Sequence, residues 1–118
     1  MKKSSTNNRN REAILNKCPV TFTLQKIGGR WKPLILWQLK DGRLRYSELR
    51  RALPLISEKM LIQQLKELEQ DGLVLREAKK VVPPYVEYML TTDGERIREV
   101  LSAMAVWGKN MQEKESRV

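Results

Sequence analysis

The clearest hydrophobic pattern in the chain lies between Ser57 and Gly72. Leu61, Leu65 and Leu68 recur at steps of three and four residues, which places them on one face of an α-helix. Ser57 is a residue type that caps a first turn, and Gly72 is the type that ends a helix in the left-handed conformation. The sequence therefore predicts an amphipathic helix here, with its leucines in a core.

Polar side chains occupy the opposite face of this helix. Glutamine can pair with adenine through two hydrogen bonds, and lysine can reach guanine or phosphate oxygens, so such a face suits the major groove of DNA. A solvated surface without a ligand is the competing interpretation. The residues predicted to read DNA bases are Ser57, Lys59, Gln63, Gln64 and Lys66.

A short helix is predicted before Gly28. Pro19 fits its first position, which places Cys18 near the N-cap. A thiolate is favoured beside the amides of a helix N-terminus and near a cation such as Lys17, so Cys18 is a candidate redox sensor. Packing of Cys18 as a small apolar residue is the alternative.

Two helices are predicted between that segment and Ser57. Residues 30–39 are apolar nearly all round, which indicates a helix buried on several sides with its tryptophans in the core. Residues 46–53 form a shorter helix that Pro54 ends, and its tight connection into the helix at Ser57 makes a helix-turn-helix. In the shorter helix we expect Leu49, Ala52 and Leu53 to face inward and Arg50 and Arg51 to face outward.

The spacing of hydrophobic residues changes after Gly72. Residues 73–78 and 85–90 both have the pattern of β-strands. Pro83-Pro84 favours a turn between them. A hairpin directly after a helix-turn-helix is a wing, although an ordinary hairpin covering the core would have the same pattern. Residues 43–45 are long enough only for a small edge strand. The residues predicted to contact DNA phosphates are Arg43, Arg45, Arg50, Arg51, Lys79 and Lys80.

The last predicted helix begins at Thr92, where Thr92-Asp93-Gly94-Glu95 matches a capping box, and ends near Glu113. Apolar residues recur on it over two heptads, which is longer than the core of one small domain requires. We therefore predict a homodimer through this helix, with the segment near Ile14 contributing. The predicted dimer contacts are Ile97, Val100, Leu101, Met104, Trp107 and Met111.

A chain of 118 residues with 41% apolar content suits one domain with one core. We expect a mobile basic arm over residues 1–12, the domain with its dimerisation helix over 13–113, and a tail over 114–118. One cysteine and no histidine argue against a metal site, a cofactor or enzyme activity. No segment resembles a membrane span or a signal peptide, so we expect a cytoplasmic protein.

Positive charge is concentrated in the first part of the chain. Residues 1–51 contain 13 Lys and Arg against 3 Asp and Glu, whereas residues 52–118 contain 10 against 11. A one-sided excess indicates an oriented basic surface for a polyanion such as double-stranded DNA. The charge alone leaves RNA, anionic lipid and simple solubility open.

Six segments between Cys18 and Lys109 fall in a characteristic order and spacing. They are Cys18-Pro19-Val20, Gly28 to Trp31, Tyr46 to Pro54, Ile56-Ser57 with the three leucines that follow, Glu69 to Val74, and Pro83 to Tyr88. Together they resemble the HxlR-type family of winged helix-turn-helix transcriptional regulators from bacteria. Two residues depart from the family pattern: Tyr85 stands where a basic residue is common, and Ile62 where a small polar residue is common.

The resemblance implies a mainly α fold with a small β-hairpin wing, dimeric through its terminal helices. The helix beginning at Ser57 would enter the major groove while the wing follows the backbone. In some members, a cysteine at the position of Cys18 responds to electrophiles or oxidants.

We therefore expect a sequence-specific DNA-binding transcriptional regulator, a repressor rather than an activator, that binds a pseudo-palindromic operator as a homodimer. Its half-site centres would lie about 34 Å apart. Regulation would act through Cys18 or through a small effector between the domain core and the last helix. The alternative function is a protein-interaction module that uses the same scaffold without reading DNA, its charge serving solubility.

Overall fold

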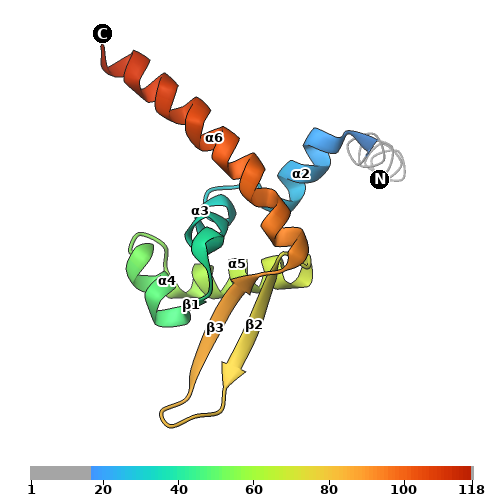
Figure 1. Cartoon of the computed structure of the whole chain (residues 1–118), viewed down its shortest axis with the longest axis vertical. Coiled ribbons are helices and arrows are strands. Elements are labelled where there is room, and N and C mark those ends of the chain that lie inside the picture. The colour runs from blue at the N-terminus through green and yellow to red at the C-terminus, as the bar shows by residue number, and fades with distance from the viewer. Residues whose placement is uncertain (1–16, 118) are drawn as a thin grey trace, which may run out of the picture.

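The computed structural model describes residues 17–117, which form helices around a small antiparallel sheet (Figure 1). The predicted basic arm and the contribution of Ile14 lie outside the described residues. In chain order the elements are α2 (Pro19–Ile27), α3 (Lys32–Gln38), the 3₁₀ helix η1 (Leu39–Asp41), β1 (Leu44–Arg45), α4 (Tyr46–Ala52), α5 (Glu58–Gln70), β2 (Val74–Lys79), β3 (Tyr85–Leu90) and α6 (Thr92–Ser116).

Helix α5 has the predicted caps. The Ser57 hydroxyl accepts a hydrogen bond of 3.1 Å from the Met60 amide, which satisfies one of the free donors of the first turn. At the other end Gly72 has a φ of 75°, and the Leu73 amide donates to the Leu68 carbonyl, as in a Schellman motif. The prediction of an amphipathic helix over this stretch is confirmed.

The core lies between α3, α4, α5 and the base of the hairpin. Leu61, Leu65 and Leu68 are at most 1% exposed, so the leucine face of α5 is buried as predicted. The other side chains with almost no exposed surface are Ile35, Leu36, Leu39, Leu49, Ile56 and Val74. Burial of this one apolar face leaves the opposite face of α5 outside the core.

The sheet has the order β1-β3-β2, so β1 is an edge strand, as the sequence suggested for residues 43–45. Strands β2 and β3 form the predicted hairpin, with Arg76 opposite Tyr88 and Glu77 opposite Glu87. Because side chains alternate across a strand, Arg76 shares a face with buried Val74. We call this face, which looks towards α5, the inner face of the wing. The opposite face carries Glu77 and Glu87 and is called the outer face.

Helix α6 begins against the end of α5. Thr91, not Thr92, is its N-cap: the Thr91 hydroxyl accepts from the Gly94 amide at 3.0 Å and donates to the Gly72 carbonyl at 2.5 Å. The predicted capping box at Thr92 is therefore wrong by one residue: either threonine can supply a capping hydroxyl, and Glu95, three residues after Thr92, favoured the wrong one. The helix also runs past the predicted end near Glu113, as far as Ser116.

Two predictions for α4 are wrong. Ala52 is exposed, because the helix ends there and the chain turns away before buried Leu53. Arg50 is half-buried rather than outward, and its guanidinium donates a hydrogen bond of 3.0 Å to the Ile56 carbonyl. Arg50 thereby ties α4 to the turn that leads into α5.

Helix α2 and the C-terminal part of α6 lie on the side of the molecule away from the hairpin tip (Figure 1). Much of their apolar surface is uncovered, including Trp107 at 68% exposed. The other exposed apolar residues on these helices are Val20, Phe22, Leu24, Val100, Met104 and Val106. Among residues 17–117, no helix combines the length and apolar content that crossing a membrane requires.

Candidate nucleic-acid interface

The outward face of α5 carries three of the predicted base-reading residues. Lys59, Gln63 and Lys66 are exposed on the side opposite the buried leucines. The Gln63 amide reaches Glu67 Oε2 at 3.4 Å, a long contact on the helix surface that a stronger partner can replace. These side chains are therefore available to a ligand laid along α5.

The other two predicted base-reading residues are engaged within the protein. The Ser57 hydroxyl caps α5, and Gln64 is half-buried with its amide nitrogen 3.5 Å from Met60 Sδ. Gln64 lies on the flank of α5 rather than on its outward face, because residues one position apart on a helix differ by about 100° in direction.

The outer face of the wing holds a cluster of four charges. Arg43 Nη1 lies 3.2 Å from Glu87 and 3.6 Å from Glu77, while Lys79 Nζ lies 2.5 Å from Glu77 and 3.7 Å from Glu87. The hydrogen bond between Lys79 and Glu77 raises the pKa of the lysine and lowers the pKa of the glutamate. Two of the predicted phosphate contacts are thus already paired with carboxylates.

The remaining predicted phosphate contacts have different surroundings. Arg51 and Lys80 are exposed and take part in none of the ion pairs among residues 17–117. Arg45 lies over the Tyr85 ring, 3.8 Å from its centroid. This contact brings a cation to the wing position where Tyr85 replaces the basic residue expected from the family pattern.

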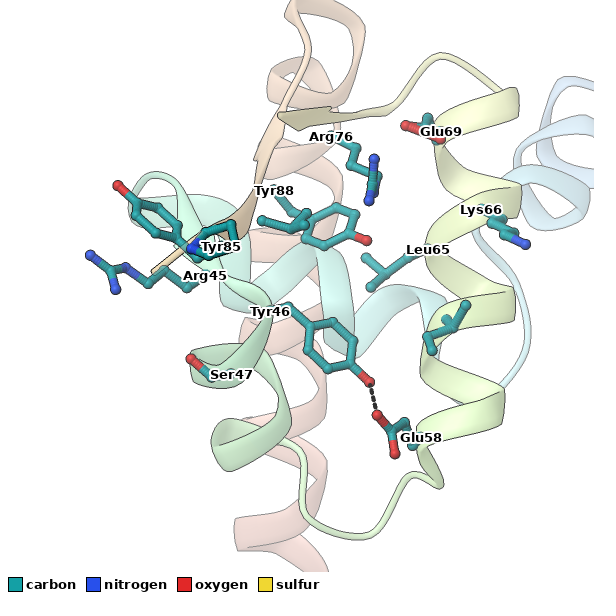
Figure 2. Close-up of a pocket in the computed structure, with 13 residues that line it drawn as sticks. Arg45, Tyr46, Ser47, Glu58, Leu65, Lys66, Glu69, Arg76, Tyr85 and Tyr88 are labelled. Carbon is teal, nitrogen blue, oxygen red and sulfur yellow. Dashed lines mark hydrogen bonds between the residues drawn. The ribbon is translucent and has the colours of Figure 1, made fainter. Parts of the chain in front are cut away.

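A groove of about 720 Å³ separates α5 from the inner face of the wing (Figure 2). Its α5 wall includes Ile62, Leu65 and Lys66, and its other wall comes from α4 and the hairpin. Glu58 lies at one end, where its carboxylate accepts a hydrogen bond of 3.3 Å from Tyr46. Burial, and then the charge of Glu58, raise the pKa of the Tyr46 hydroxyl.

The sequence predictions did not include Arg76, Tyr46 or Tyr88 among the site residues, although all three line this groove. A signal for Arg76 existed: it follows buried Val74 by two residues, and alternation in a strand puts both on one face. An arginine on a face directed at another element is a candidate ligand contact. Tyr88 is only 7% exposed, which alternation with Glu87 could also have indicated.

Cys18 is exposed at the N-cap of α2, as predicted, with Pro19 in the first turn. The side chain forms no capping hydrogen bond of good geometry. The Thr21 amide, the Thr21 hydroxyl and the Val20 amide nevertheless face the sulfur and lower the pKa of the Cys18 thiol below its usual value. Donors directed at the sulfur favour the thiolate.

The predicted dimer contacts on α6 divide into two groups. Leu101 is 4% exposed within the core of its own protomer, and Ile97 packs against that core. Val100, Met104 and Trp107 are between 41% and 68% exposed, and Met111 is half-buried. Only the second group offers apolar surface to another molecule.

Within residues 17–117 no cluster of three or more His, Cys, Asp or Glu side chains could hold a metal ion. The arrangement that remains is α4 and α5 joined by a tight turn and followed by the β2–β3 hairpin, which defines a winged helix-turn-helix.

Comparisons with known proteins place this fold in a class of transcriptional regulators. The structure of the redox regulator HypR in its oxidised form matches with a TM-score of 0.75 at 46% identity, covering 79% of this chain and 96% of that chain. Its reduced form matches with a TM-score of 0.79 at 42% identity, covering 86% and 100%.

The family model described as HxlR-like helix-turn-helix matches residues 26–116. An uncharacterised HTH-type transcriptional regulator from Methanothermobacter thermautotrophicus is 48% identical over 92 residues, which are 78% of this chain and 70% of the relative. The chain therefore belongs to the HxlR-like helix-turn-helix family and is a transcriptional regulator of the helix-turn-helix type. The resemblance inferred from the sequence is confirmed.

Proposed function

We propose that this regulator binds double-stranded DNA as a homodimer and represses transcription from a pseudo-palindromic operator. The observation that carries the proposal is the division of α5 into two faces. Three leucines hold one face in the core, while Lys59, Gln63 and Lys66 stay exposed on the other. A helix held in this way can enter a major groove without losing its packing.

Lys59, Gln63 and Lys66 are the base-reading residues in this proposal, with Ser57 and Gln64 acting beside them. Ser57 fixes the start of α5, where its own hydroxyl is already engaged. The Gln64 amide would have to leave Met60 before it could reach a base. Gln63 is the best candidate for a specific contact, because glutamine recognises adenine through two hydrogen bonds.

Phosphate neutralisation would come first from Arg51 and Lys80, which are exposed. Arg45 would join them from its position over Tyr85. Arg43 and Lys79 would contribute less, because a phosphate must compete with Glu77 and Glu87 for them. Arg50 would act indirectly, by holding the turn before α5.

The uncovered apolar surface of α2 and α6 supports the homodimer. Val100, Met104 and Trp107 lie on α6, and Phe22 and Leu24 lie on α2, all more than 40% exposed. Apolar patches of this kind on a small protein usually mark an interaction surface. Two copies joined through these helices would present two α5 helices, as a two-fold symmetric operator requires.

Cys18 is the proposed site of regulation. The names of two similar structures describe HypR as a redox regulator in oxidised and reduced forms. In this chain the exposed thiol with its lowered pKa supports the same kind of response. We expect an oxidant to change operator affinity for the native chain and to leave Cys18→Ser unchanged. An equal response of both proteins would exclude the thiol.

The test of DNA readout compares a selected genomic fragment with random duplex in gel shifts at two salt concentrations. Gln63→Ala should reduce the preference for the selected fragment by about 1–3 kcal/mol while leaving nonspecific binding intact. Gln25→Ala, which changes an exposed glutamine on α2, is the matched control. An unchanged preference would remove Gln63 as a reader, and the lack of any salt-dependent shift would favour a protein-interaction module instead.

A further inference from the structure

The groove between α5 and the inner face of the wing has the dimensions of a small-molecule site. Its volume of about 720 Å³ lies within the range of roughly 300–1,000 Å³ that such sites occupy. Ile62 and Leu65 of α5 form one wall, and Val86 of β3 belongs to the other. The rings of Tyr46 and Tyr88 lie on that second side (Figure 2). Walls of this composition suit a flat aromatic group.

Two polar groups converge in the same groove. Tyr88 is 7% exposed, and its hydroxyl points from β3 towards α5 without a hydrogen bond to any residue in 17–117 (Figure 2). Arg76 lies directly opposite Tyr88 across the hairpin. Its guanidinium takes part in none of the ion pairs formed among the same residues. Both groups are donors, and neither has an acceptor within the described part of the chain, residues 17–117.

We propose that this groove binds an aromatic carboxylate. The ring would lie against Ile62 and Leu65, and the carboxylate would accept hydrogen bonds from Arg76 and Tyr88. A guanidinium presents two parallel N–H groups that match the two oxygens of a carboxylate, which makes this pairing stronger and more directional than one with a neutral oxygen.

The charges around the groove favour an anion overall. Arg45, Lys66 and Arg76 line it together with two glutamates, Glu58 and Glu69. Both glutamates oppose a bound anion, but Glu58 also accepts the hydrogen bond from Tyr46, so the charge of Glu69 is the one that can be removed without losing that bond. Removal of the Glu69 charge should therefore strengthen binding.

The consequence for regulation rests on the proposed function. Lys66 belongs both to the outward face of α5 and to the groove, and Ile62 lies beside it. A ligand between α5 and the wing would occupy the space through which these two elements approach a DNA backbone. Binding of the ligand and binding of the operator would then oppose each other. By linkage, each would lower the affinity for the other by the same factor.

Calorimetric titration of the full chain, without DNA, tests ligand binding by itself. The probes are 2-naphthoate and its neutral counterpart 2-naphthalenemethanol. We expect saturable binding of the carboxylate and binding of the alcohol that is weaker by about tenfold or more, because a charged hydrogen-bonded group is lost. Arg76→Met should weaken the binding of 2-naphthoate by a similar factor, and Glu69→Gln should strengthen its binding. Arg96→Met on exposed α6 is the matched control and should change nothing.

Equal affinity for both probes, no saturable binding, or an unchanged affinity of Arg76→Met would overturn the proposal. If Arg76→Met does not fold, the affinities of the two probes for the native chain and for Tyr88→Phe decide. Loss of the Tyr88 hydroxyl should weaken the binding of 2-naphthoate. Amide chemical shifts should move on α5, β2 and β3; changes confined to α2 and α6 would place the ligand elsewhere. If Arg76→Met weakens only DNA while 2-naphthoate does not bind, Arg76 is a phosphate contact: this inference fails and the proposed function stands.

Discussion

Gly94 lies where the first turn of α6 crosses the backbone that follows α5. A Cβ atom added at Gly94 would lie 2.1 Å from the Leu73 carbonyl oxygen, which is far closer than real contacts allow. The same residue donates its amide to Thr91, so the turn cannot move away without losing the cap. Only glycine fits at position 94, because no side-chain atom can be accommodated there. This close contact fixes the start of α6 relative to the end of α5.

Gly94→Ala is accordingly predicted to lower the free energy of unfolding by about 1–3 kcal/mol, the cost of overpacking a close contact. Gly108→Ala in the same helix meets nothing within 4 Å and should raise stability by about 0.4–1 kcal/mol. Urea denaturation of the two variants measures both effects. Equal stability of Gly94→Ala and the native chain would mean that α6 can shift from Leu73 at no cost.

Lys32 is another residue that local sequence did not identify. It is 8% exposed at the start of α3, and its ammonium lies 2.8 Å from Glu67 Oε1 on α5. The hydrogen bond from Lys32, and then its charge, lower the pKa of Glu67. Because Gln63 also contacts Glu67, this ion pair adjoins the face proposed to read DNA.

Since the pKa of Glu67 is lower in the folded protein, its pairing with Lys32 stabilises the fold above the ordinary carboxyl pKa and loses this effect as pH falls through the folded value. Glu67→Gln should therefore be less stable than the native chain at pH 7, and the difference should shrink in acid, below about pH 4. Denaturation curves at both pH values test this. The matched control is Glu69→Gln on the same helix, whose stability should follow the native chain; a pH-independent deficit in Glu67→Gln would contradict the assignment to charge.

At the scale of elements, the wing differs from a simple basic hairpin. Its outer face places Glu77 and Glu87 directly opposite each other, an unfavourable arrangement of like charges that Arg43 and Lys79 neutralise. One cation of the hairpin, Lys79, and one from the residue before β1, Arg43, are thus engaged in holding the sheet together. Lys80, beyond the paired strands, remains exposed for a partner.

Glu87→Gln is predicted to strengthen binding to all duplex sequences alike, because it removes the nearer carboxylate partner of Arg43 and the farther partner of Lys79. Glu77 alone is then left to pair with both cations. The slope of log affinity against log salt should steepen by up to about one. Gel shifts with random duplex over a salt series measure both quantities. Glu99→Gln on exposed α6 is the control, and an unchanged slope for Glu87→Gln would show that the freed cations do not reach phosphate.

At the scale of the whole molecule, the hairpin and the two terminal helices lie at opposite ends (Figure 1). The end with α2 and α6 holds most of the uncovered large apolar side chains, whereas the hairpin end holds the polar face of α5 and the wing. Such a division separates a surface suited to self-association from one suited to a polyanion. The proposed dimer would form through the apolar surfaces of α2 and α6. It would leave the α5 and wing surface of each protomer open to DNA.

Trp107→Glu is predicted to convert the proposed dimer to a monomer, because it puts a charge into the apolar surface of α6. Val82→Glu is the control: Val82 is even more exposed, at 99% against 68%, but lies near the hairpin tip. Light scattering at micromolar concentration should report a monomer for the first variant and a dimer for the second. A native chain that is already monomeric would remove the dimer from the proposal.

The elements and their order followed from the sequence because their signals are local. The leucine spacing and the caps of α5 act within a few residues, as does the alternation that produces β2 and β3. Pro19 likewise identified the start of α2 and the N-cap position of Cys18. The one-residue error at Thr92 arose because the capping-box pattern with Glu95 favoured Thr92, whereas contact with the Gly72 carbonyl, far away in the sequence, fixes Thr91 as the N-cap.

Which charged side chains are free was decided only by the tertiary structure. Arg43 and Lys79 are residue types that contact phosphates. In the folded chain, however, strand register places each of them in ion-pair distance of Glu77 and Glu87. Arg50 faces a carbonyl because the turn after α4 folds back towards it. The physical reason is that periodicity and capping depend on neighbours in the chain, whereas ion pairs, grooves and close contacts depend on distances between segments far apart in it.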